Sequence, residues 1–423
     1  MLTLKLLREE PEFVIERLSV KNVDAKETVY KILEIDARRR AAQTQADALS
    51  AEQKKTAAAI GMLMQQGNRQ EAEQMKVKAS ESREKVKELL LEQEKLEKDL
   101  NDMLVLLPNL PHALVARGKS AEDNVLVREG GQVPVLSQDA LPHWELAKKY
   151  DIIDFDLGVK LTGAGFPVYK GQGARLQFAL ISYFLDENAS AGYKEIMPPI
   201  MVNEDSGYGT GQLPDKSEQM YHAGLDNFYM IPTAEVPVTN IYRDVIINRS
   251  ELPVKLTAYT PCFRREAGSY GKDVRGLNRL HQFDKVEIVQ LTHPSDSYDT
   301  LDQMVKHVEG LVQSLQLPYR IIRLCGGDIS FTSAMTYDFE VYSAAQGRWL
   351  EVSSVSNFET FQSNRLKARF RDEDGKPQLV HTLNGSSLAL PRIVAALLEN
   401  NQTPDGIMMP EVLHKYLHFN KIQ

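Results

Sequence analysis

The first hundred residues differ from the rest of the chain in their pattern of apolar positions, which recur at alternating steps of three and four along two stretches. In the later stretch eight of ten positions are apolar: Ala72, Met75, Ala79, Ser82, Val86, Leu89, Gln93, Leu96, Leu100 and Met103. The earlier stretch follows the same steps less cleanly: Ile32, Ile35, Arg39, Ala42, Ala46, Leu49, Gln53, Thr56, Ile60 and Leu63. This spacing predicts two long helices with coiled-coil seams.

Between the two stretches lies a short polar link with one glycine, from Gln65 to Arg69. Two long helices joined by so short a loop must run antiparallel. Because the link is short and the seams match in length, the sequence favours a hairpin within one chain over a rod that dimerises. A helix of about 32 residues spans roughly 50 Å, so we expect an arm of that length.

A proline-bearing stretch from Leu107 to His112 ends the second helix. We therefore expect a helical arm over residues 1–108 and a second domain over residues 109–423. The first part of that domain, residues 109–130, is polar and reads as an irregular linker.

Beyond residue 130 the pattern changes to short β-rich runs, punctuated by Gly and Pro, with a few helices between them. Examples are residues 228–232, 255–259 and 280–291. The runs do not alternate regularly with helices, so the sequence predicts an α+β domain in which helices flank an antiparallel sheet. The chain has neither a GxxxxGK[ST] loop nor a strand-linked GxGxxG, so the standard phosphate loops would not hold ATP here.

Composition excludes several classes of protein. The 423 residues are 43% hydrophobic and 26% charged, as in ordinary globular proteins. No apolar run reaches the ~18 residues of a membrane span, and the N-terminus turns acidic within ten residues, unlike a signal peptide. The two cysteines, Cys262 and Cys325, form no CxxC pair and are expected to be reduced thiols. We therefore expect a cytoplasmic protein without a membrane partner.

Charge is unevenly distributed along the chain. The net charge is −8, yet the outer arm from Arg38 to Lys87 has eleven Lys and Arg against six Asp and Glu, a balance of +5. Any nucleic acid would therefore meet a local basic surface. Candidate contacts are Arg38, Arg39, Lys54, Lys55, Lys76 and Lys78. From the arm alone, an ordinary solvated coiled-coil face remains the alternative.

The most informative segment runs from Cys262 to Glu287. Two strand-like runs bracket a Gly-rich loop, Ala267 to Gly276. Strand side chains alternate between faces, which predicts one face with Arg264 and Glu266, and another whose members are Arg279, His281, Phe283, Lys285 and Glu287. Arginine forks bind carboxylates and phosphates, a ring can stack on a base, and carboxylates can hold an ammonium or a hydroxyl. Alternation alone leaves an exposed, charged hairpin as the other interpretation.

Residues 263–287 read FRREAGSYGKDVRGLNRLHQFDKVE. This segment resembles motif 2 of the class II aminoacyl-tRNA synthetases in its seryl form, FRxEAGSxGKDxRGLxRxHQFxKVE. Other blocks agree in order: Gly192–Pro199 resembles motif 1, Thr233–Glu235 the serine-binding TxE, Glu351–Ser354 the metal and ATP strand, and His381–Ser387 with the following Leu388–Glu399 motif 3. The N-terminal hairpin resembles the tRNA-binding arm of that family, so the resemblance covers essentially the whole chain.

The resemblance implies a two-step reaction. L-Serine is activated with ATP to seryl-adenylate, and the seryl group then moves to tRNA(Ser), with tRNA(Sec) as a second candidate acceptor. Positioning and charge neutralisation would supply the catalysis, without a general base on the protein. The resemblance also implies Mg²⁺ and a homodimer, with Pro199 at its interface. Two alternatives stay open: a serine-activating paralogue that loads a carrier protein, and a non-catalytic RNA-binding paralogue.

The resemblance also assigns roles by matched position. Thr233, Ala234 and Glu235 would hold the serine ammonium, with Thr233 and Glu235 expected on one strand face. Glu287 and Ser386 would bind the serine hydroxyl.

For ATP, Arg264 would bridge the serine carboxylate and the α-phosphate, and Phe283 would stack under adenine. The adenine edge falls to Arg265, Glu266 and Leu280. Arg279 and Arg392 would hold the β- and γ-phosphates and, with Arg264, form the catalytic set, while Arg275 is a further candidate. The strand block is Glu351, Val352, Ser353 and Ser354.

Glu351 and Ser354 would bind Mg²⁺, a hard cation that prefers oxygen ligands. Their spacing of three does not place them on one strand face, so we expect a bulge or a strand end there.

Motif 3 departs from the family pattern, NGSGLAVGR, because Ser387 and Pro391 stand where two glycines are usual. Proline is tolerated only in or near the first turn of a helix, so we expect the helix that carries Arg392 to begin close to Pro391.

Overall fold

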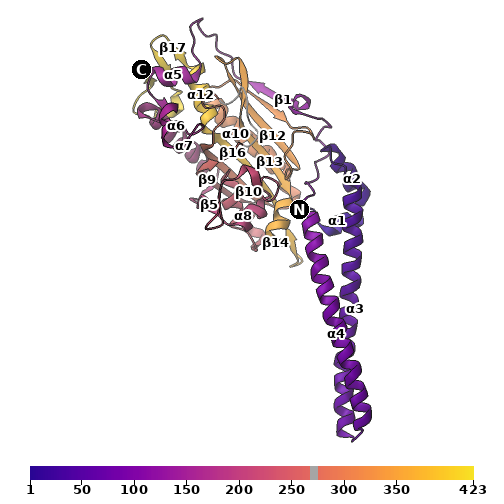
Figure 1. Ribbon diagram of the computed structural model, residues 1–423. Helices are drawn as coiled ribbons and strands as arrows, with labels where there is room; N and C mark the ends of the chain where they lie inside the picture. The colour runs from indigo at the N-terminus through magenta and orange to yellow at the C-terminus, as the bar shows by residue number, and fades with distance from the viewer. Residues whose placement is uncertain (267–274) are drawn as a thin grey trace. The chain divides into compact units, whose positions relative to one another are not determined.

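The structure is a computed structural model that describes residues 1–266 and 275–423. The chain divides into two compact units, which are described separately (Figure 1). One unit, the arm, comprises Met1–Ser19 and Val23–Pro108. The other contains the motifs that resemble the class II synthetases and is therefore termed the catalytic unit; it comprises Val20–Asn22 and Asn109–Gln423.

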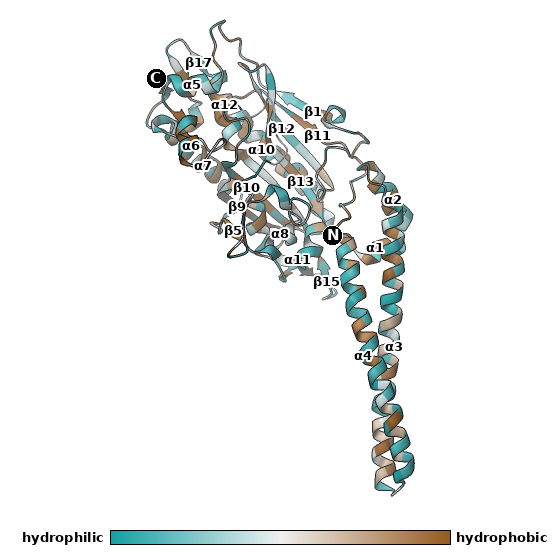
Figure 2. Ribbon diagram, viewed as in Figure 1, coloured by the Kyte–Doolittle hydropathy of each residue, from teal (hydrophilic) through white to brown (hydrophobic). Residues whose placement is uncertain are grey.

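The arm is built on an antiparallel helical hairpin, α3 (Lys26–Gln65) and α4 (Arg69–Leu104), preceded by two short helices, α1 (Leu4–Glu9) and α2 (Pro11–Val20). Every one of the predicted seam positions is buried or half-buried. Hydrophilic and hydrophobic residues alternate along both long helices (Figure 2). The predicted hairpin is therefore confirmed.

Packing within the arm weakens from its base toward its tip. Near the base the seam side chains of Ile32 and Leu100 are fully buried, whereas near the tip Ile60 is only half-buried. One seam contact is polar, because Gln53 Nε2 donates to Ser82 Oγ at 3.1 Å. A two-helix arm buries only one narrow stripe, so the hydrophobic stabilisation per residue is small at its tip.

Asp36 is a charged side chain that is fully buried on α3. It accepts hydrogen bonds from Arg8, Arg39 and Arg40 at 3.0–3.1 Å. Burial by itself would raise the pKa of Asp36, but the three arginines hold it below its usual value. This cluster ties α1 to α3.

The catalytic unit is built on an eight-stranded sheet in the order β1-β11-β12-β13-β16-β10-β9-β4. All neighbours are antiparallel except β4 and β9, which are parallel. The strands are β1 (Val125–Gly130), β4 (Lys194–Glu195), β9 (Val254–Phe263), β10 (Gln282–Thr292), β11 (Tyr319–Arg323), β12 (Met335–Ser343), β13 (Arg348–Glu359) and β16 (His381–Ala389). The predicted α+β architecture, with an antiparallel sheet and flanking helices, is confirmed.

Three helices pack against the central strands: α7 (Gly171–Ser190), α10 (Ser297–Ser314) and α12 (Leu390–Asn400). The other helices of this unit are α5 (His143–Lys149), α6 (Phe155–Leu161), α8 (Glu204–Thr210), α9 (Glu235–Asn240) and α11 (Phe361–Leu366). On β10, Val286 and Ile288 join the main core, while Lys285 and Glu287, which alternate with them, point to the cavity described below. The alternation of a strand thus separates the core from the site.

Short strands form four smaller sheets around the large one. They are β2 (Ile153–Asp154) with β3 (Val168–Tyr169); β5 (Met201–Val202), β7 (Phe228–Met230) and β6 (His222–Ala223); β8 (Ile246–Asn248), β14 (Arg369–Arg371) and β15 (Pro377–Leu379); and β17 (Gln402–Thr403), β18 (Gly406–Met408) and β19 (Lys421–Ile422). Within the described residues, no helix has the length and apolar character needed to cross a membrane. Both cysteines are buried and unbridged.

The interpretation of residues 109–130 as an irregular linker is wrong for its last part. Val125–Gly130 forms β1, which pairs with β11 at the edge of the large sheet. Its side chains are largely exposed, so the strand exists through backbone pairing and has little hydrophobic alternation to reveal it.

The loop from Ser330 to Ala334 is held by residues next to the boundaries between the units. Lys21 Nζ donates to the carbonyl oxygens of Ser330 and Ser333 at 2.9 and 2.8 Å. Asn109 Nδ2 donates to the carbonyl of Thr332 at 2.9 Å. Ser330 and Thr332 also line the main cavity, so these two anchors support one of its walls.

Candidate active site

A cavity of about 700 Å³ lies on the face of the sheet where Lys285 and Glu287 point. Fourteen of the residues predicted for the site line it: Thr233, Glu235, Arg264, Glu266, Arg279, Leu280, Phe283, Glu287, Glu351, Val352, Ser353, Ser354, Ser386 and Arg392. Ala234 and Arg265 do not line it. Ala234 is buried in a neighbouring hydrophobic cluster, and the backbone N–H of Arg265 donates to the Gln219 carbonyl at 2.8 Å.

Glu287 is the centre of a buried polar cluster in this cavity. Its Oε2 atom accepts hydrogen bonds from Thr233 Oγ1 at 3.2 Å and Ser386 Oγ at 3.4 Å, and forms an ion pair with Lys285 Nζ at 2.7 Å. Glu287 and Ser386 are register partners on β10 and β16. One carboxylate oxygen with three donors around it can exchange a partner for the hydroxyl or ammonium of a ligand.

Glu235 is a second buried carboxylate, 7% exposed, at the wall of the same cavity. Burial, followed by the charge of Glu287, raises its pKa to about 7. Gln362 Nε2 donates to its Oε1 atom at 2.5 Å. The repulsion between Glu235 and Glu287 favours a cationic ligand, because an ammonium would relieve it.

The prediction that Thr233 and Glu235 share a strand face is wrong. Glu235 is the first residue of α9, and Thr233 lies just before it, with its Oγ1 accepting from the Glu235 backbone N–H at 3.2 Å. Pro237 falls in the first turn, where a helix has no need of its missing N–H. A helix start thus brings the two side chains into the cavity.

The strand-face prediction for the arginines is also wrong, because β9 ends at Phe263 and β10 begins at Gln282. Arg264 and Arg279 lie beyond the strands and still line the cavity. The Arg264 guanidinium lies 5.2 Å from the Phe283 ring centroid, and Arg279 Nε forms a 3.0 Å ion pair with Glu266. These two pairs place two cations, one aromatic ring and one carboxylate in the cavity lining.

His281, predicted to share a strand face with Arg279 and Phe283, is absent from the cavity lining. Its Nδ1 atom lies 3.0 Å from both the Tyr221 hydroxyl and the Arg264 carbonyl oxygen, and its ring stacks on Phe166. The Gly-rich loop from Ala267 lies outside the described residues up to position 274.

The expected bulge between Glu351 and Ser354 is confirmed. On β12 the neighbours Phe339 and Glu340 pair with Ser353 and Glu351 of β13, so Val352 is the extra residue of a bulge. Ser354 Oγ consequently approaches Glu351 Oε1 at 3.5 Å. Arg392 Nη1 donates to the Glu351 carbonyl at 2.7 Å, which brings a cation next to this pair.

The α12 helix begins at Leu390, with Pro391 in its first turn, as its sequence predicted. Arg392 therefore projects from the first turn toward the cavity that it lines.

Many other residues that line the cavity have no predicted role, and three of the polar ones lie close to predicted residues. Lys285 neutralises Glu287, Asn384 lies two residues before Ser386 on β16, and Asp338 is the register partner of Ser354 on β12. Burial, followed by the charge of Glu351, raises the pKa of Asp338. Alternation from Ser386 would have pointed to Asn384, whereas only the strand pairing brings Asp338 to the site.

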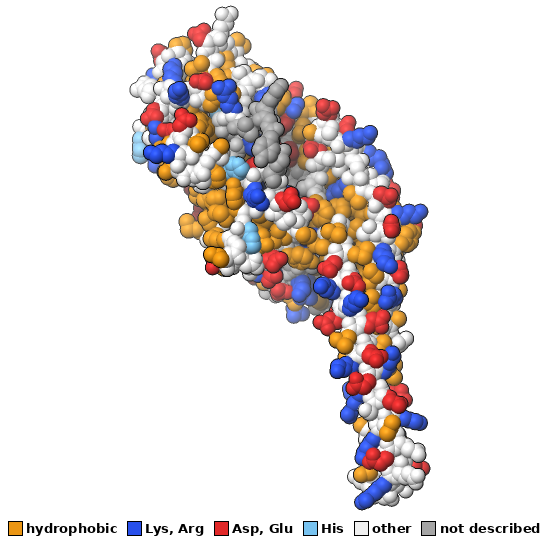
Figure 3. Space-filling view, viewed as in Figure 1, with side chains coloured by type: hydrophobic (Ala, Val, Ile, Leu, Met, Phe, Trp, Pro, Cys, Tyr) orange, Lys and Arg blue, Asp and Glu red, His pale blue; other side chains and the backbone are white. Residues whose placement is uncertain are grey.

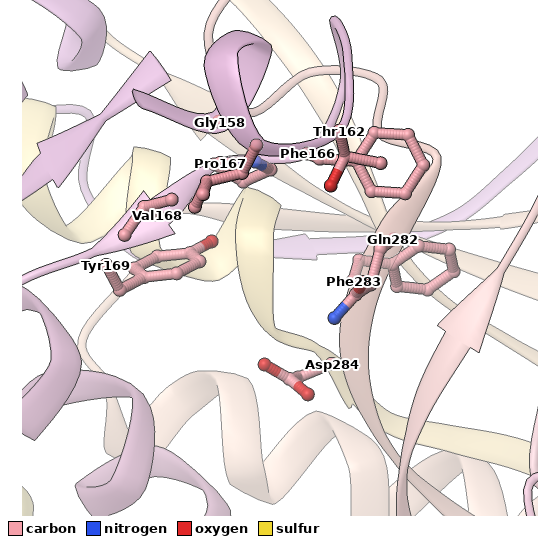
Figure 4. A pocket seen from close by; sticks show the side chains of 10 residues that line it. Gly158, Thr162, Phe166, Pro167, Val168, Tyr169, Gln282, Phe283 and Asp284 are labelled. Carbon is pink, nitrogen blue, oxygen red and sulfur yellow. The ribbon is translucent and has the colours of Figure 1, made fainter. Parts of the chain in front are cut away.

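A smaller cavity of about 200 Å³ shares Phe283 with the main one (Figure 4). Figure 4 shows Tyr169, Phe166 and Asp284 around it. The Tyr259 hydroxyl donates to Asp284 at 2.9 Å, and burial raises the pKa of this carboxyl.

On the arm, blue and red side chains are interspersed along the surface (Figure 3). Of the six predicted contacts, Arg38, Arg39 and Lys76 form ion pairs with Glu92, Asp36 and Glu73 respectively. Arg39 is only 17% exposed and also approaches Glu97, so its charge is engaged within the arm. The remaining three, Lys54, Lys55 and Lys78, are exposed.

Two family models match this chain. Residues 1–111 match the seryl-tRNA synthetase N-terminal domain, and residues 220–401 match the tRNA synthetase class II core domain (G, H, P, S and T).

Full-length relatives agree with this assignment. The serine–tRNA ligase of Salinibacter ruber is 49% identical over 424 residues, which cover 100% of this chain and 99% of the relative. That of Geobacter sulfurreducens is 45% identical over 99% of this chain and 98% of the relative.

Among solved structures, the seryl-tRNA synthetase of Pyrococcus horikoshii complexed with ATP is 33% identical, with a TM-score of 0.94 over 100% of this chain and 99% of that one. The cytoplasmic enzyme of Naegleria fowleri in complex with AMP is 26% identical, with a TM-score of 0.88 and the same coverage. The chain therefore belongs to the seryl-tRNA synthetase family of class II aminoacyl-tRNA synthetases.

Proposed function

We propose that this protein activates L-serine with ATP to form seryl-adenylate and then transfers the seryl group to tRNA(Ser). The observation that carries the proposal is the buried cluster in which Thr233 and Ser386 both reach Glu287, with Glu235 beside it. This cluster suits a small ligand with one hydroxyl and one ammonium. The relatives named serine–tRNA ligase support the same assignment.

Serine binding uses the two carboxylates in different ways. Glu235, with Thr233, holds the ammonium, whose positive charge favours the ionised form of the raised-pKa carboxyl. Glu287 and Ser386 hold the hydroxyl. Alanine or glycine would leave these buried groups unpaired, which can discriminate against them by roughly 10⁴ or more. Ala234 is buried beneath the site and supports it through packing.

ATP binding requires two ion pairs to open. Phe283 stacks under adenine, while Leu280, Glu266 and the backbone near Arg265 contact its edge. Glu266 pairs with Arg279 in the free protein, so this pair separates when Arg279 turns to the phosphates.

Arg392 likewise exchanges its contact with Glu351 for the β- and γ-phosphates. Arg264, whose guanidinium lies over the Phe283 ring, bridges the serine carboxylate and the α-phosphate. The serine carboxylate is the nucleophile, so these arginines act by orienting it and by balancing charge as pyrophosphate leaves.

The donor set at the bulge fits Mg²⁺. Glu351 and Ser354 supply one carboxylate and one hydroxyl oxygen close together, while Val352 and Ser353 continue the strand. Mg²⁺ usually takes one or two carboxylates and completes its shell with water and substrate phosphates. When bound, it would neutralise phosphate charge. Among the described residues no group of three or more His, Cys, Asp or Glu side chains is arranged to hold a metal.

We further propose that the arm binds the tRNA, through shape and backbone contacts more than through base sequence. Lys54, Lys55 and Lys78 are better placed for this than Arg39, because their charges are exposed. Whether tRNA(Sec) is also an acceptor is a question for the same charging assay.

We also propose a homodimer. Val159, Leu161, Phe178 and Met197 are 54–95% exposed, an unusual display of large apolar side chains. Hydrophobic side chains gather over the part of the molecule where Figure 1 labels α7 (Figure 3). Pro199, which the resemblance places at the dimer interface, lies close to Met197 in the chain.

A cytoplasmic location stays a prediction.

The testing experiment is serine-dependent exchange of pyrophosphate into ATP without tRNA, with alanine and threonine as controls. Exchange with serine alone supports activation and the hydroxyl-reading cluster. Transfer to purified tRNA(Ser) then separates a tRNA ligase from a paralogue that loads a carrier protein. A folded sample without exchange would favour a non-catalytic RNA-binding protein, and Ser387 and Pro391 would be the first residues to revert.

A further inference from the structure

The backbone that leads into Arg279 is held by a fully buried histidine outside the predicted site. The Leu277 N–H donates to His143 Nε2 at 2.8 Å, and His143 Nδ1 lies 2.7 Å from Glu399 Oε1. Both His143 and Glu399 are 0% exposed. His143 comes from α5, so a helix remote in sequence fixes the chain two residues before Arg279.

These contacts define the state of His143. Nε2 accepts from the Leu277 N–H and therefore carries no proton. The ring proton of His143 is thus on Nδ1, which donates to Glu399. Burial by itself would raise the pKa of Glu399, but hydrogen bonds from His143 and Ser343 hold it below its usual value. Glu399 is therefore a carboxylate that orients a neutral imidazole toward the backbone.

A second connection reaches the next residue. Gln346 Nε2 donates to Glu399 Oε1 at 3.1 Å, and its Oε1 accepts from Asn278 Nδ2 at 2.9 Å. The Asn278 carbonyl in turn accepts from Arg392 Nε at 3.3 Å. Arg392 and Glu399 are seven residues apart on α12 and hence on one face of it. The same helix thus holds this short segment at two points.

Helix α5 also contacts Arg275, which lies two residues before Leu277. The Arg275 guanidinium lies 4.9 Å from the Trp144 ring centroid and 3.9 Å from Glu145. A purely structural network would fill the core and need not end on this backbone. Here its ends are the Leu277 N–H and the Asn278 side chain, immediately before Arg279, and the Asn278 carbonyl, which Arg392 contacts.

We propose that His143 is a positioning residue that sets the placement of Arg279 and Arg392 for the phosphates of ATP. The proposal rests on the phosphate-binding roles given to these arginines above. It predicts that loss of the acceptor at Nε2 weakens the binding of ATP specifically, since among the described residues no hydrogen bond joins the serine cluster around Glu287 to this network.

The test compares His143→Asn with His143→Gln in serine-dependent pyrophosphate exchange. The amide of Asn lies near the position of Nδ1 and keeps the contact with Glu399, but it leaves the Leu277 N–H without an acceptor. The longer Gln can place its amide oxygen near the position of Nε2. We expect His143→Asn to raise the KM for ATP about tenfold, the effect of one lost buried hydrogen bond, with the KM for serine nearly unchanged. His143→Gln should recover most of the loss.

Gln346→Ala provides a second variant in case His143→Asn does not fold, because it removes the Asn278 contact at a partly exposed side chain. It should shift the KM for ATP in the same direction. His414→Asn, whose ring contacts the Met409 carbonyl, is the matched control and should behave as wild type.

Equal increases in both KM values, or equal losses in the Asn and Gln variants, would overturn the proposal and leave the network a part of the core. An unchanged KM for ATP in every variant would overturn it as well. Failure of the proposed function is a different result, because the wild-type protein would then show no exchange at all.

Discussion

The arm and the catalytic unit treat their polar side chains in opposite ways. Most charges on the arm are exposed, and pairs such as Lys76 with Glu73 contribute little to stability. In the catalytic unit, Glu287 is buried with Lys285 and Thr233 as partners, so losing one partner leaves the others unpaired. We therefore expect substitutions on the arm to change tRNA binding alone. Substitutions of buried residues in the cavity should change both serine activation and the free energy of unfolding.

Removal of the arm is the most severe test of this division. We expect deletion of residues 36–100 to spare serine activation and to abolish the charging of tRNA, because the lining of the cavity comes entirely from the other unit. Pyrophosphate exchange and tRNA charging, measured on the same sample, give the two readings. Undiminished charging would remove the assignment of the arm as a tRNA-binding element.

Arg264→Ala is the corresponding test within the catalytic unit. The substitution removes the cation that lies over Phe283 and that we place between the serine carboxylate and the α-phosphate. We expect pyrophosphate exchange to fall by about 10³-fold or more, a loss typical for a preorganised transition-state contact. Far-UV circular dichroism and the oligomeric state should stay as in wild type. Retention of exchange would show that this arginine does not take part in activation.

The same comparison explains how far the sequence could predict the structure. The arm was readable because its helices follow one period over their whole length, and every seam position proved buried or half-buried. Most of the cavity lining could be anticipated because the resemblance matched several short motifs whose residues line one cavity. Asp338 was missed, since only the pairing of β12 with β13 brings it opposite Ser354. Thr233 and Glu235 were placed on a strand because α9, only six residues long, is too short to show a helical period.

The third prediction uses pH to test the buried carboxylates. The pKa of Glu235 is raised to about 7, so below that pH it is protonated and cannot hold the serine ammonium as an ion pair. We expect the KM for serine to rise as the pH falls through 7, and Glu235→Gln to remove this dependence while weakening serine binding at every pH. Steady-state exchange kinetics between pH 6 and 8 supply the measurement.

The free energy of unfolding should also depend on the ionisation of Glu235. The folded protein binds the Glu235 proton more tightly than the unfolded chain does, so this contribution is present at low pH and is lost as the pH rises from about 4.5 through 7. Above pH 7 and without serine, Glu235→Gln should therefore be more stable than wild type, by as much as about 3 kcal/mol. Urea unfolding at pH 6 and pH 8 tests this, and equal stabilities at pH 8 would contradict the raised pKa.

The smallest effect is expected from the exposed lysines of the arm. Lys54→Ala combined with Lys55→Ala should leave the free energy of unfolding within about 0.5 kcal/mol of wild type and should leave serine activation unchanged. The KM for tRNA should rise several-fold. The dependence of charging on salt should also become shallower, because fewer phosphate contacts mean that fewer counterions are released on binding. Lys31→Ala, an exposed lysine paired with Glu34 near the base of α3, is the matched control. If the two variants weaken tRNA binding equally, the effect reflects the overall charge of the arm, and the outer surface has no specific part in binding.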